Sequence, residues 1–438
     1  MQNLSAFAQK SFRIRAGLSA VEVHRESVKI LDEKLRRRNG LLQRQQRSNA
    51  CVYVHDHQLS LGLAATHAKA LTRFSAWLAA VSVVPPRATV DVILPGELQR
   101  RRGPGGSRGV KGYGLGTMLI YLGAACAVTL ALWSWVGDAD FSTLFAYYFL
   151  RGLWPKYRGK VVWITGGSSG IGEQLAYIFA RLDSKIVISG TRHKELERVR
   201  NRCETISEEC DVLILQGNIT DFEQHLKWVK TVATKYGTID VLINNAGRSQ
   251  RSEFVKIPMQ IERELFDVNV FGMISLTRQV LKYWAEQNKV NGQILVTSSA
   301  AGKWGAPFSA TYNASKHALH GYFETLRSEM QVLKRPISIT IACPGPVRSN
   351  LRVTAYTDKI GETYNRPDPP KEQVSLMDTT RCARLMVAGL ASGLDELWIA
   401  RQPVLIVYYL AQYMPSIYHR WLLPLIMNKN TMKIRDGK

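Results

Sequence analysis

Short apolar runs alternate with segments of helical periodicity from Gly159 to about residue 402, and this alternation limits the possible folds more than any other feature. Six runs have the length and composition of buried strands: KVVWIT, KIVIS, DVLILQ, DVLINN, QILVTS and SITIAC. Strands that alternate with helices form a parallel sheet covered by helices on both faces. The sequence therefore predicts one doubly wound α/β domain over 159–402.

A glycine-rich segment, TGGSSGIG at 165–172, directly follows the first of these strands and opens a helix. Glycines allow a tight turn and a close approach of the backbone to a pyrophosphate, and the unpaired N–H groups of a helix N-terminus favour an anion there. A plain strand-to-helix turn would need only one of these glycines. The segment therefore predicts a Rossmann-like nucleotide site.

A serine, a tyrosine and a lysine form the candidate catalytic set. Ser299 follows the run QILVTS, and Tyr312 and Lys316 lie four residues apart in TYNASK. Residues four apart share a helix face, so we expect the Lys316 ammonium to lie beside the Tyr312 phenol and to lower its pKa. This spacing also occurs by chance on exposed helices, so the prediction depends on its combination with Ser299 and the glycine-rich turn.

Together with NNAG at 244–247, these motifs resemble the short-chain dehydrogenase/reductase family. The resemblance implies an oxidoreductase that moves hydride between a nicotinamide dinucleotide and a carbonyl or secondary alcohol. Ser299 would polarise the substrate carbonyl and Tyr312 would donate its proton. Lys316 would tune Tyr312, and Asn269 in LFDVNVFG would complete a water-linked proton path.

Two assignments within the family pattern require a choice. Ser298 stands beside Ser299, and the spacing to Tyr312 favours Ser299. After the second strand run the chain reads Gly-Thr191-Arg192, without the acid that holds the ribose hydroxyls of NAD(H). Arg192 could neutralise a 2′-phosphate, which favours NADP(H) over NAD(H). The family often places its arginine where Thr191 stands, so Arg192 could instead be a solvated charge at the start of a helix.

The resemblance also implies a cofactor-binding set drawn from several strand ends. Asn218 stands where the family commonly has an Asp that contacts adenine, and Ser349 where it often has a Thr for the nicotinamide carboxamide. The full implied set is Thr165, Gly166, Ser168, Ser169, Gly170, Ile171, Gly172, Arg192, Asn218, Asn244, Ala246, Gly247, Tyr312, Lys316, Pro344, Gly345, Val347 and Ser349.

Longer stretches, including GRSQRS, NASKHALHGYF, PGPVRSN and ELWIARQP, resemble membrane-bound members of the family. Those members lie in the endoplasmic reticulum membrane and reduce steroid, retinoid and xenobiotic carbonyls with NADPH. The resemblance therefore implies an apolar carbonyl or alcohol as substrate. The alternative is a non-catalytic membrane module that keeps the fold and holds nucleotide, but such a module has no use for the Tyr312–Lys316 pair.

The formal net charge of +23 is unevenly distributed along the chain, because residues 1–111 carry 19 Lys and Arg against 7 Asp and Glu. Basic flanks beside apolar segments suggest contact with anionic lipid, and solvated ends are the alternative. Nucleic-acid binding is not expected, because the basic N-terminus lacks interleaved aromatic residues. We predict a basic, partly disordered extension and linker over 1–114.

An uncharged apolar stretch over 115–137 predicts one transmembrane helix. From Thr117 to Gly137 a helix would be about 31 Å long, close to the thickness of a hydrocarbon core of about 30 Å. Trp133 and Trp135 lie near one end, as in membrane interfaces. Basic residues on both sides nearly balance, with a slight preference for a luminal catalytic domain. The expected location is the endoplasmic reticulum membrane, with a single pass.

Two flanking segments complete the predicted organisation: a juxtamembrane linker over 138–158 and an apolar C-terminal extension over 403–438. Pro415, His419 and Arg420 interrupt the extension, so neither part is long enough to span a bilayer. It could lie in the membrane interface, cap the domain or form a homodimer contact. The six cysteines show no CxxC pair and no zinc-like spacing, so no metal is expected.

Overall fold

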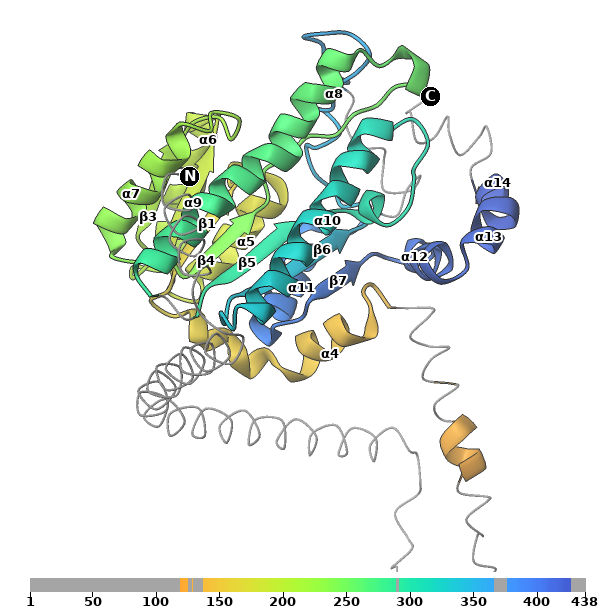
Figure 1. Ribbon diagram of the computed structural model, residues 1–438. Helices are drawn as coiled ribbons and strands as arrows, with labels where there is room; N and C mark the ends of the chain where they lie inside the picture. Colours follow the sequence, from red (N-terminus) through yellow and green to blue (C-terminus); the bar gives the residue numbers. More distant parts are fainter. Residues whose placement is uncertain (1–118, 125–127, 129–136, 289–290, 366–375, 427–438) are drawn as a thin grey trace, which may run out of the picture. The chain divides into compact units, whose positions relative to one another are not determined.

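The computed structural model describes residues 119–124, 128, 137–288, 291–365 and 376–426 (Figure 1). The predicted extension over 1–114 lies outside these residues, and so does most of the predicted span over 115–137. Residues 119–124 are helical and exposed. Across the described ranges, no helix combines the length and the apolar character that a bilayer crossing requires.

Seven parallel strands form one sheet in the order β3-β2-β1-β4-β5-β6-β7 (Figure 1). They are β1 (Val161–Thr165), β2 (Lys185–Gly190), β3 (Val212–Gln216), β4 (Val241–Asn244), β5 (Gln293–Thr297), β6 (Ser338–Pro344) and β7 (Glu396–Ile399). The first six coincide with the predicted apolar runs, so the predicted doubly wound sheet is confirmed. The strand order reverses between β1 and β4, which is where ligands bind in sheets of this kind.

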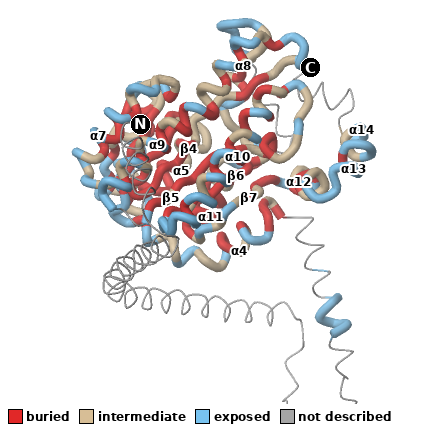
Figure 2. Tube along the Cα trace, viewed as in Figure 1, coloured by how far each residue is buried: buried red, intermediate tan, exposed pale blue. Residues whose placement is uncertain are grey.

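Helices cover both faces of the sheet (Figures 1 and 2). Helices α4 (Phe141–Phe149), α5 (Gly170–Ala180), α6 (His193–Ile206) and α11 (Thr379–Ser392) share one apolar core with Val162 and Ile164 of β1. Helices α7 (Gln224–Tyr236), α9 (Gly272–Glu286) and α10 (Ala310–Val332) share the other core with Val161 and Trp163. Strand β1 is buried on both faces, which explains its uninterrupted apolar sequence.

Residues 138–158, predicted as a juxtamembrane linker, are folded against the domain instead. They contain α4 and the 3-10 helix η2 (Arg151–Tyr157). Asp140 caps α4 by accepting a hydrogen bond from Thr143 N at 2.8 Å, and its Oδ2 accepts one from Trp398 N at 2.7 Å. Asp138 pairs with Arg381 of α11 at 2.8 Å. The sequence hid this packing because the partners are more than 200 residues away along the chain.

The segment that starts at residue 403 also begins inside the domain. In α12 (Val404–Tyr413), Leu405 and Tyr408 are fully buried, and the Tyr408 hydroxyl donates to the Cys343 carbonyl oxygen at 2.7 Å. The following C-terminal arm consists of α13 (Pro415–Ile417), the π-helix η6 (Tyr418–Leu422) and α14 (Leu423–Ile426). Figure 2 shows this arm as mostly exposed. An extension counted from residue 403 therefore contains both a core helix and an exposed arm.

Candidate active site

The glycine-rich turn joins β1 to α5 and brings the backbone of two loops together. Gly166 has a φ of +66°, and a Cβ added there would stand 2.8 Å from the Ala246 Cα. A Cβ on Gly172 would collide with the Gly166 carbonyl oxygen. Larger residues would therefore push α5 and the loop after β4 away from the turn. The two glycines shape a cradle with the N-terminus of α5 at one side.

This cradle opens into a cavity of about 530 Å³ at the carboxyl ends of the strands. Most of the residues predicted from the sequence line it: Thr165, Gly166, Ser168, Ser169, Gly170, Ile171, Arg192, Asn218, Ala246, Gly247, Ser299, Tyr312, Lys316, Pro344, Gly345, Val347 and Ser349. Three predicted residues, Gly172, Asn244 and Asn269, are not part of its lining. One cavity thus joins the nucleotide-type turn to the candidate catalytic set.

The NNAG segment contributes its second asparagine to the cavity rather than its first. Asn244 is the last residue of β4, is fully buried, and donates to the Thr277 hydroxyl at 2.8 Å. Asn245 lines the cavity, and its backbone N donates to the Thr165 hydroxyl at 2.9 Å. Successive side chains of a strand point to opposite sides, which separates the two asparagines. Asn244 therefore braces the sheet, and Asn245 is a cavity residue that the sequence analysis missed.

Arg192 follows β2 and lies over the glycine-rich turn. Its guanidinium donates to the Ser168 hydroxyl at 3.0 Å and to the Ser169 hydroxyl at 2.7 Å. The side chain therefore points toward the turn and not away from it. Among the described residues, no Asp or Glu lines the cavity. This end of the cavity is suited to a phosphate group.

Ser299, Tyr312 and Lys316 meet at the other end of the cavity. Ser299 follows β5, its hydroxyl donates to the Pro344 carbonyl oxygen at 3.4 Å, and it lies near enough to Tyr312 to oppose the rise in the Tyr312 pKa. Tyr312 and Lys316 lie on α10, with Lys316 Nζ 5.8 Å from the centre of the Tyr312 ring. The ammonium donates to the Thr297 carbonyl oxygen at 2.9 Å. Ser298 also lines the cavity, but its hydroxyl donates to the Lys316 carbonyl oxygen at 3.2 Å, which leaves Ser299 as the serine that acts on Tyr312.

Burial controls the ionisation of this pair. It raises the pKa of Tyr312, although the Ser299 side chain and the charge of Arg251 act in the opposite direction. It lowers the pKa of Lys316 to about 8. The sequence led us to expect a lowered tyrosine pKa, but the cost of desolvating the phenolate is the larger effect here. Tyr312 therefore holds its proton at neutral pH, as a proton donor must.

Asn269 lies behind the cavity in a π-helix, η4 (Asp267–Phe271), between α8 (Met259–Phe266) and α9. Its side chain is fully buried, accepts from Arg248 N at 2.8 Å and donates to the Ser315 hydroxyl at 3.0 Å. A Cβ on Gly247 would stand 3.3 Å from Asn269 Oδ1 and 3.6 Å from Lys316 Nζ. Asn269 thus ties α10 to the loop after β4. The wider turn of a π-helix often occurs at functional positions.

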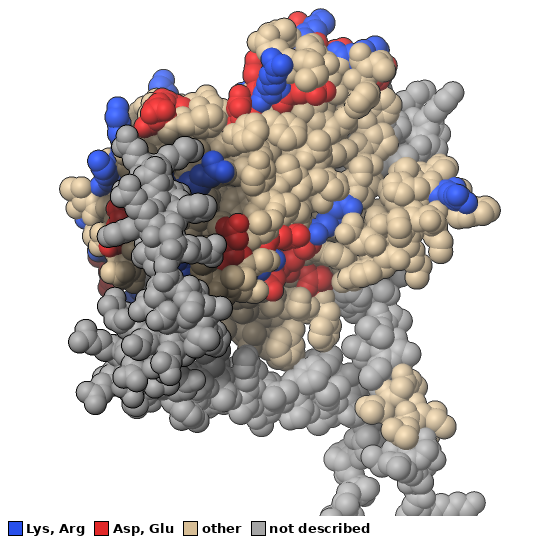
Figure 3. Space-filling model, viewed as in Figure 1, with Lys and Arg blue, Asp and Glu red and all other residues tan. Residues whose placement is uncertain are grey.

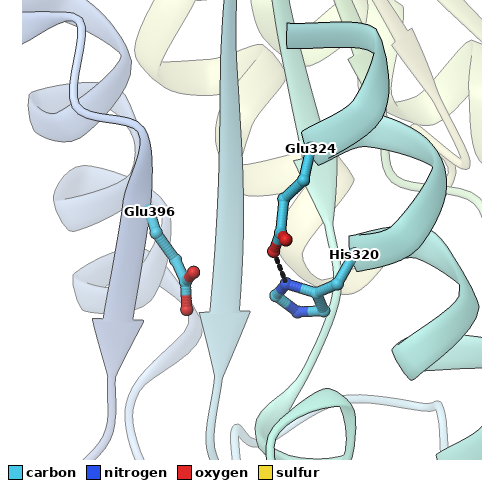
Figure 4. A group of neighbouring side chains, drawn as sticks. All are labelled: His320, Glu324 and Glu396. Atoms are coloured by element: carbon cyan, nitrogen blue, oxygen red, sulfur yellow. Dashed lines mark hydrogen bonds and ion pairs between the residues drawn. The ribbon is translucent and has the colours of Figure 1, made fainter. Parts of the chain in front are cut away.

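A second polar cluster joins α10 to β7: His320 and Glu324 lie on α10, and Glu396 lies on β7 (Figure 4). His320 is 3.0 Å from Glu324 and, through its other ring nitrogen, 3.2 Å from the Ser298 hydroxyl. Ligand atoms of His320, Glu324 and Glu396 all lie within 4.8 Å of one another, so they could hold a metal ion. Lys303 is 2.7 Å from Glu396, however, and supplies a positive charge there. The sequence analysis missed this cluster because no linear metal-binding spacing marks it.

Comparisons with known proteins agree on the family. A family model described as short chain dehydrogenase matches residues 160–360. The human protein Dehydrogenase/reductase SDR family member 7 is 37% identical over 328 residues, which cover 73% of this chain and 94% of that protein. The 11-beta-hydroxysteroid dehydrogenase 1A of Arabidopsis thaliana is 34% identical over 236 residues, which cover 53% of this chain and 66% of that protein.

A solved structure supports the fold. A short chain dehydrogenase/reductase from Burkholderia phymatum in complex with NAD gives a TM-score of 0.52 at 22% identity, covering 60% of this chain and 95% of that chain. The parallel sheet, the glycine-rich turn and the sequence relatives lead to one conclusion. The chain belongs to the short-chain dehydrogenase/reductase family and is an oxidoreductase.

Proposed function

We propose that this protein is an NADP(H)-dependent carbonyl reductase or alcohol dehydrogenase in which Ser299, Tyr312, Lys316 and Asn269 form the catalytic machinery. The observation that carries the proposal is that Ser299, Tyr312 and Lys316 line the same cavity as the glycine-rich turn. A nucleotide-holding module without chemistry would not need a buried lysine beside a tyrosine.

The cavity fits a nicotinamide dinucleotide. The Gly166 and Gly172 positions leave no room for a Cβ, so backbone N–H groups at the start of α5 can approach a pyrophosphate. Arg192, already directed at Ser168 and Ser169, would hold a 2′-phosphate, which favours NADP(H). When bound, the dinucleotide supplies or accepts the hydride.

The chain's own groups would then hold the substrate and move a proton. The Ser299 hydroxyl would donate to the carbonyl oxygen, and Tyr312 would give its proton to the same oxygen. The Lys316 ammonium would stabilise the phenolate that this transfer leaves, because an opposite charge at short range favours the anion. Asn269 acts as a positioning residue, since it braces both α10 and the loop after β4.

Apolar side chains in the segments around the cavity mouth support an apolar substrate skeleton. The loop after β4 bonds to two other segments, through Arg251 N to the Tyr356 oxygen at 2.8 Å and Ser252 N to the Phe308 oxygen at 3.2 Å. Exposed apolar residues on these segments are Phe254, Val255, Met259, Phe308, Leu351 and Ile360. Exposed apolar groups of this kind mark binding surfaces. We infer a steroid, retinoid or xenobiotic carbonyl class.

Membrane attachment is part of the proposal, with a span over 115–137, the catalytic domain over 159–402 and the endoplasmic reticulum as location. The described C-terminal arm supports a position next to a bilayer, because Trp421 and Leu425 are 71% and 74% exposed. In the view of Figure 3, the surface around α13 and α14 is mostly uncharged, with some basic atoms. Such a surface suits an interface with lipid head groups.

The direct test is NADPH consumption by the detergent-solubilised protein with a panel of steroid, retinoid and quinone carbonyls. Tyr312→Phe should lower kcat by about 10²- to 10⁴-fold, because the phenyl group cannot donate a proton. Tyr322→Phe, an exposed tyrosine on the same helix, is the matched control and should keep full activity. Activity that survives Tyr312→Phe would refute the assignment.

A further inference from the structure

Three arginines stand in two segments that frame the cavity on the Tyr312 side: Arg248, Arg251 and Arg352. The segments are clamped together, because Tyr356 N donates to the Ser249 oxygen at 2.9 Å and Arg251 N donates to the Tyr356 oxygen at 2.8 Å. Arg248 and Tyr356 line the cavity. The positive charge of Arg251 lowers the pKa of Tyr312, which opposes the effect of burial. Positive charge is therefore concentrated near the reacting group.

Arg352 has the least expected environment of the three. Its residue is only 9% exposed, and its Nε and Nη2 atoms have no hydrogen-bond partner within the described structure. The nearby residues Leu351 and Thr354 line the cavity, but Arg352 itself is not part of the lining. Two buried guanidinium nitrogens without an acceptor are costly, and such a group in a native protein needs an explanation.

Aromatic rings hold two of these cations in place without neutralising them. The Arg248 guanidinium lies 4.8 Å from the centre of the Tyr356 ring, and that of Arg352 lies 5.6 Å from the Tyr364 ring. Cation–π contacts orient an arginine and leave its donors available for an anion.

The carboxylates near these segments do not neutralise the charges of Arg248 and Arg352. Glu253 pairs with Lys256 at 3.0 Å, and Glu362 pairs with Lys359 at 3.5 Å. In the described part of the chain, Arg248 and Arg352 form no ion pair with any acid. Among the described residues, the charges of Arg248 and Arg352 therefore have no acidic partner.

We propose that the substrate carries an anionic group, a carboxylate or a sulfate, on its apolar skeleton, and that Arg248 receives this group while the carbonyl lies at Ser299 and Tyr312. The buried charge of Arg352, next to the cavity wall, adds to the attraction. The inference depends on the proposed function and narrows its substrate class. Arg192 lies over the glycine-rich turn, so the cofactor phosphate has its own arginine.

The test compares a keto acid with its methyl ester, which differ in charge and little in shape, using the full-length protein in detergent. We expect kcat/KM to be at least about 10-fold higher for the acid, because charge-assisted hydrogen bonds are worth that much or more. Arg248→Gln should abolish the difference by raising KM for the acid about 10-fold, and should leave the ester within about 2-fold. Arg263→Gln, an exposed arginine on α8, is the matched control.

Arg352→Met separates binding from folding. Removing a buried, unpaired charge should leave the free energy of unfolding unchanged or higher, while KM for the acid rises by less than in Arg248→Gln, because Arg352 acts through its electric field and not by contact. A large loss of stability with an unchanged KM would make Arg352 a structural residue and overturn its part in the site. A wild-type preference for the ester, or equal losses for acid and ester in Arg248→Gln, would overturn the proposal. A rise in KM for NADPH alone would assign Arg248 to the cofactor instead.

A binding measurement keeps the test independent of turnover. The acid, but not the ester, should raise the melting temperature of the wild type, and this shift should vanish in Arg248→Gln. Failure of the proposed function would appear differently, as no NADPH consumption with either compound. Absence of the acid-specific shift would count against the anion site even if the ester were turned over.

Discussion

Burial acts in opposite directions on the two ionisable side chains at the centre of the site. It keeps Tyr312 protonated by raising its pKa, and it lowers the pKa of Lys316 to about 8. A protonated phenol can donate to a carbonyl oxygen, and a lysine that titrates near neutrality makes the site sensitive to pH. The pKa values of Tyr312 and Lys316 are therefore set more by desolvation than by the proximity of the two groups.

Lys316 leads to a prediction about pH. Its ammonium is present below about pH 8 and is lost as the pH rises through this value. We therefore expect kcat/KM for carbonyl reduction to fall above about pH 8, because the group that stabilises the phenolate loses its charge. Lys316→Met should have little activity and no such alkaline limb. A limb that persists unchanged in that variant would contradict the assignment.

The same shift has a consequence for stability. The unfolded chain holds the Lys316 proton up to a pKa of about 10.4, so between about pH 8 and 10 the unfolded state binds more protons than the native state. The contribution of this group to the free energy of unfolding therefore rises with pH across that window. Urea unfolding at several pH values should show the rise in the wild type and a smaller rise in Lys316→Met.

Arg192 carries the predicted choice of cofactor. Replacing it with glutamine removes the charge beside Ser168 and Ser169. KM for NADPH should rise about 10- to 100-fold, and KM for NADH should change by less than about 2-fold, because only NADPH has the 2′-phosphate. Arg202→Gln, an exposed arginine on α6, serves as the control. Equal losses with both cofactors would show that Arg192 does not read the phosphate.

At the scale of elements, helix α4 shows how a segment before the first strand becomes part of the domain. Asp140 is 8% exposed, caps α4 through Thr143 and accepts a hydrogen bond from the Trp398 backbone of β7. Its backbone N also donates to the Trp398 oxygen at 2.8 Å. One residue thus fixes a helix start and attaches it to the edge of the sheet.

Asp140→Ala should lower the free energy of unfolding by about 2–4 kcal/mol, because a cap and a charge-assisted hydrogen bond are lost together. Asp140→Asn keeps an acceptor oxygen and should lose much less. Chemical unfolding of both variants, followed by tryptophan fluorescence, measures the difference. A loss below about 0.5 kcal/mol for the alanine variant would mean that α4 is only loosely attached.

At the scale of the whole molecule, the C-terminal arm is an exposed, apolar segment attached to a well-packed domain. Tyr418 of the arm is buried against Trp304, with ring centres 5.9 Å apart, so the arm is anchored at one point. Trp421 and Leu425 remain exposed. This combination of a fixed base and an apolar outer side fits contact with a bilayer.

Trp421→Asp combined with Leu425→Asp should lower kcat/KM for a hydrophobic ketone presented in lipid nanodiscs, because the charges oppose contact with the acyl region. Turnover of a water-soluble aldehyde should stay within about 2-fold of the wild type, since the cavity is unchanged. Leu226→Asp, at an exposed leucine on α7, is the control. Equal effects on both substrates would point to a packing role for the arm.

The sequence by itself determined the sheet and the main parts of the site. Six strands were predicted from apolar runs, because a strand buried on both faces must be apolar throughout. The seventh strand, β7, was missed, because it has only four residues and their burial alternates, so its sequence contains no continuous apolar run. The glycine-rich turn and the Tyr312–Lys316 spacing were also predictable, since each is a local pattern whose geometry a single turn or helix fixes.

Only the tertiary structure decided which neighbours meet. It directed Asn245 rather than Asn244 to the cavity, packed residues 138–158 against β7 and α11, and placed Arg248 in the cavity wall. It also reversed the expected shift of the Tyr312 pKa, because desolvation depends on every element packed around the phenol. Periodicity records burial along one element, whereas contacts between distant elements and the electrostatics they create exist only in the folded chain.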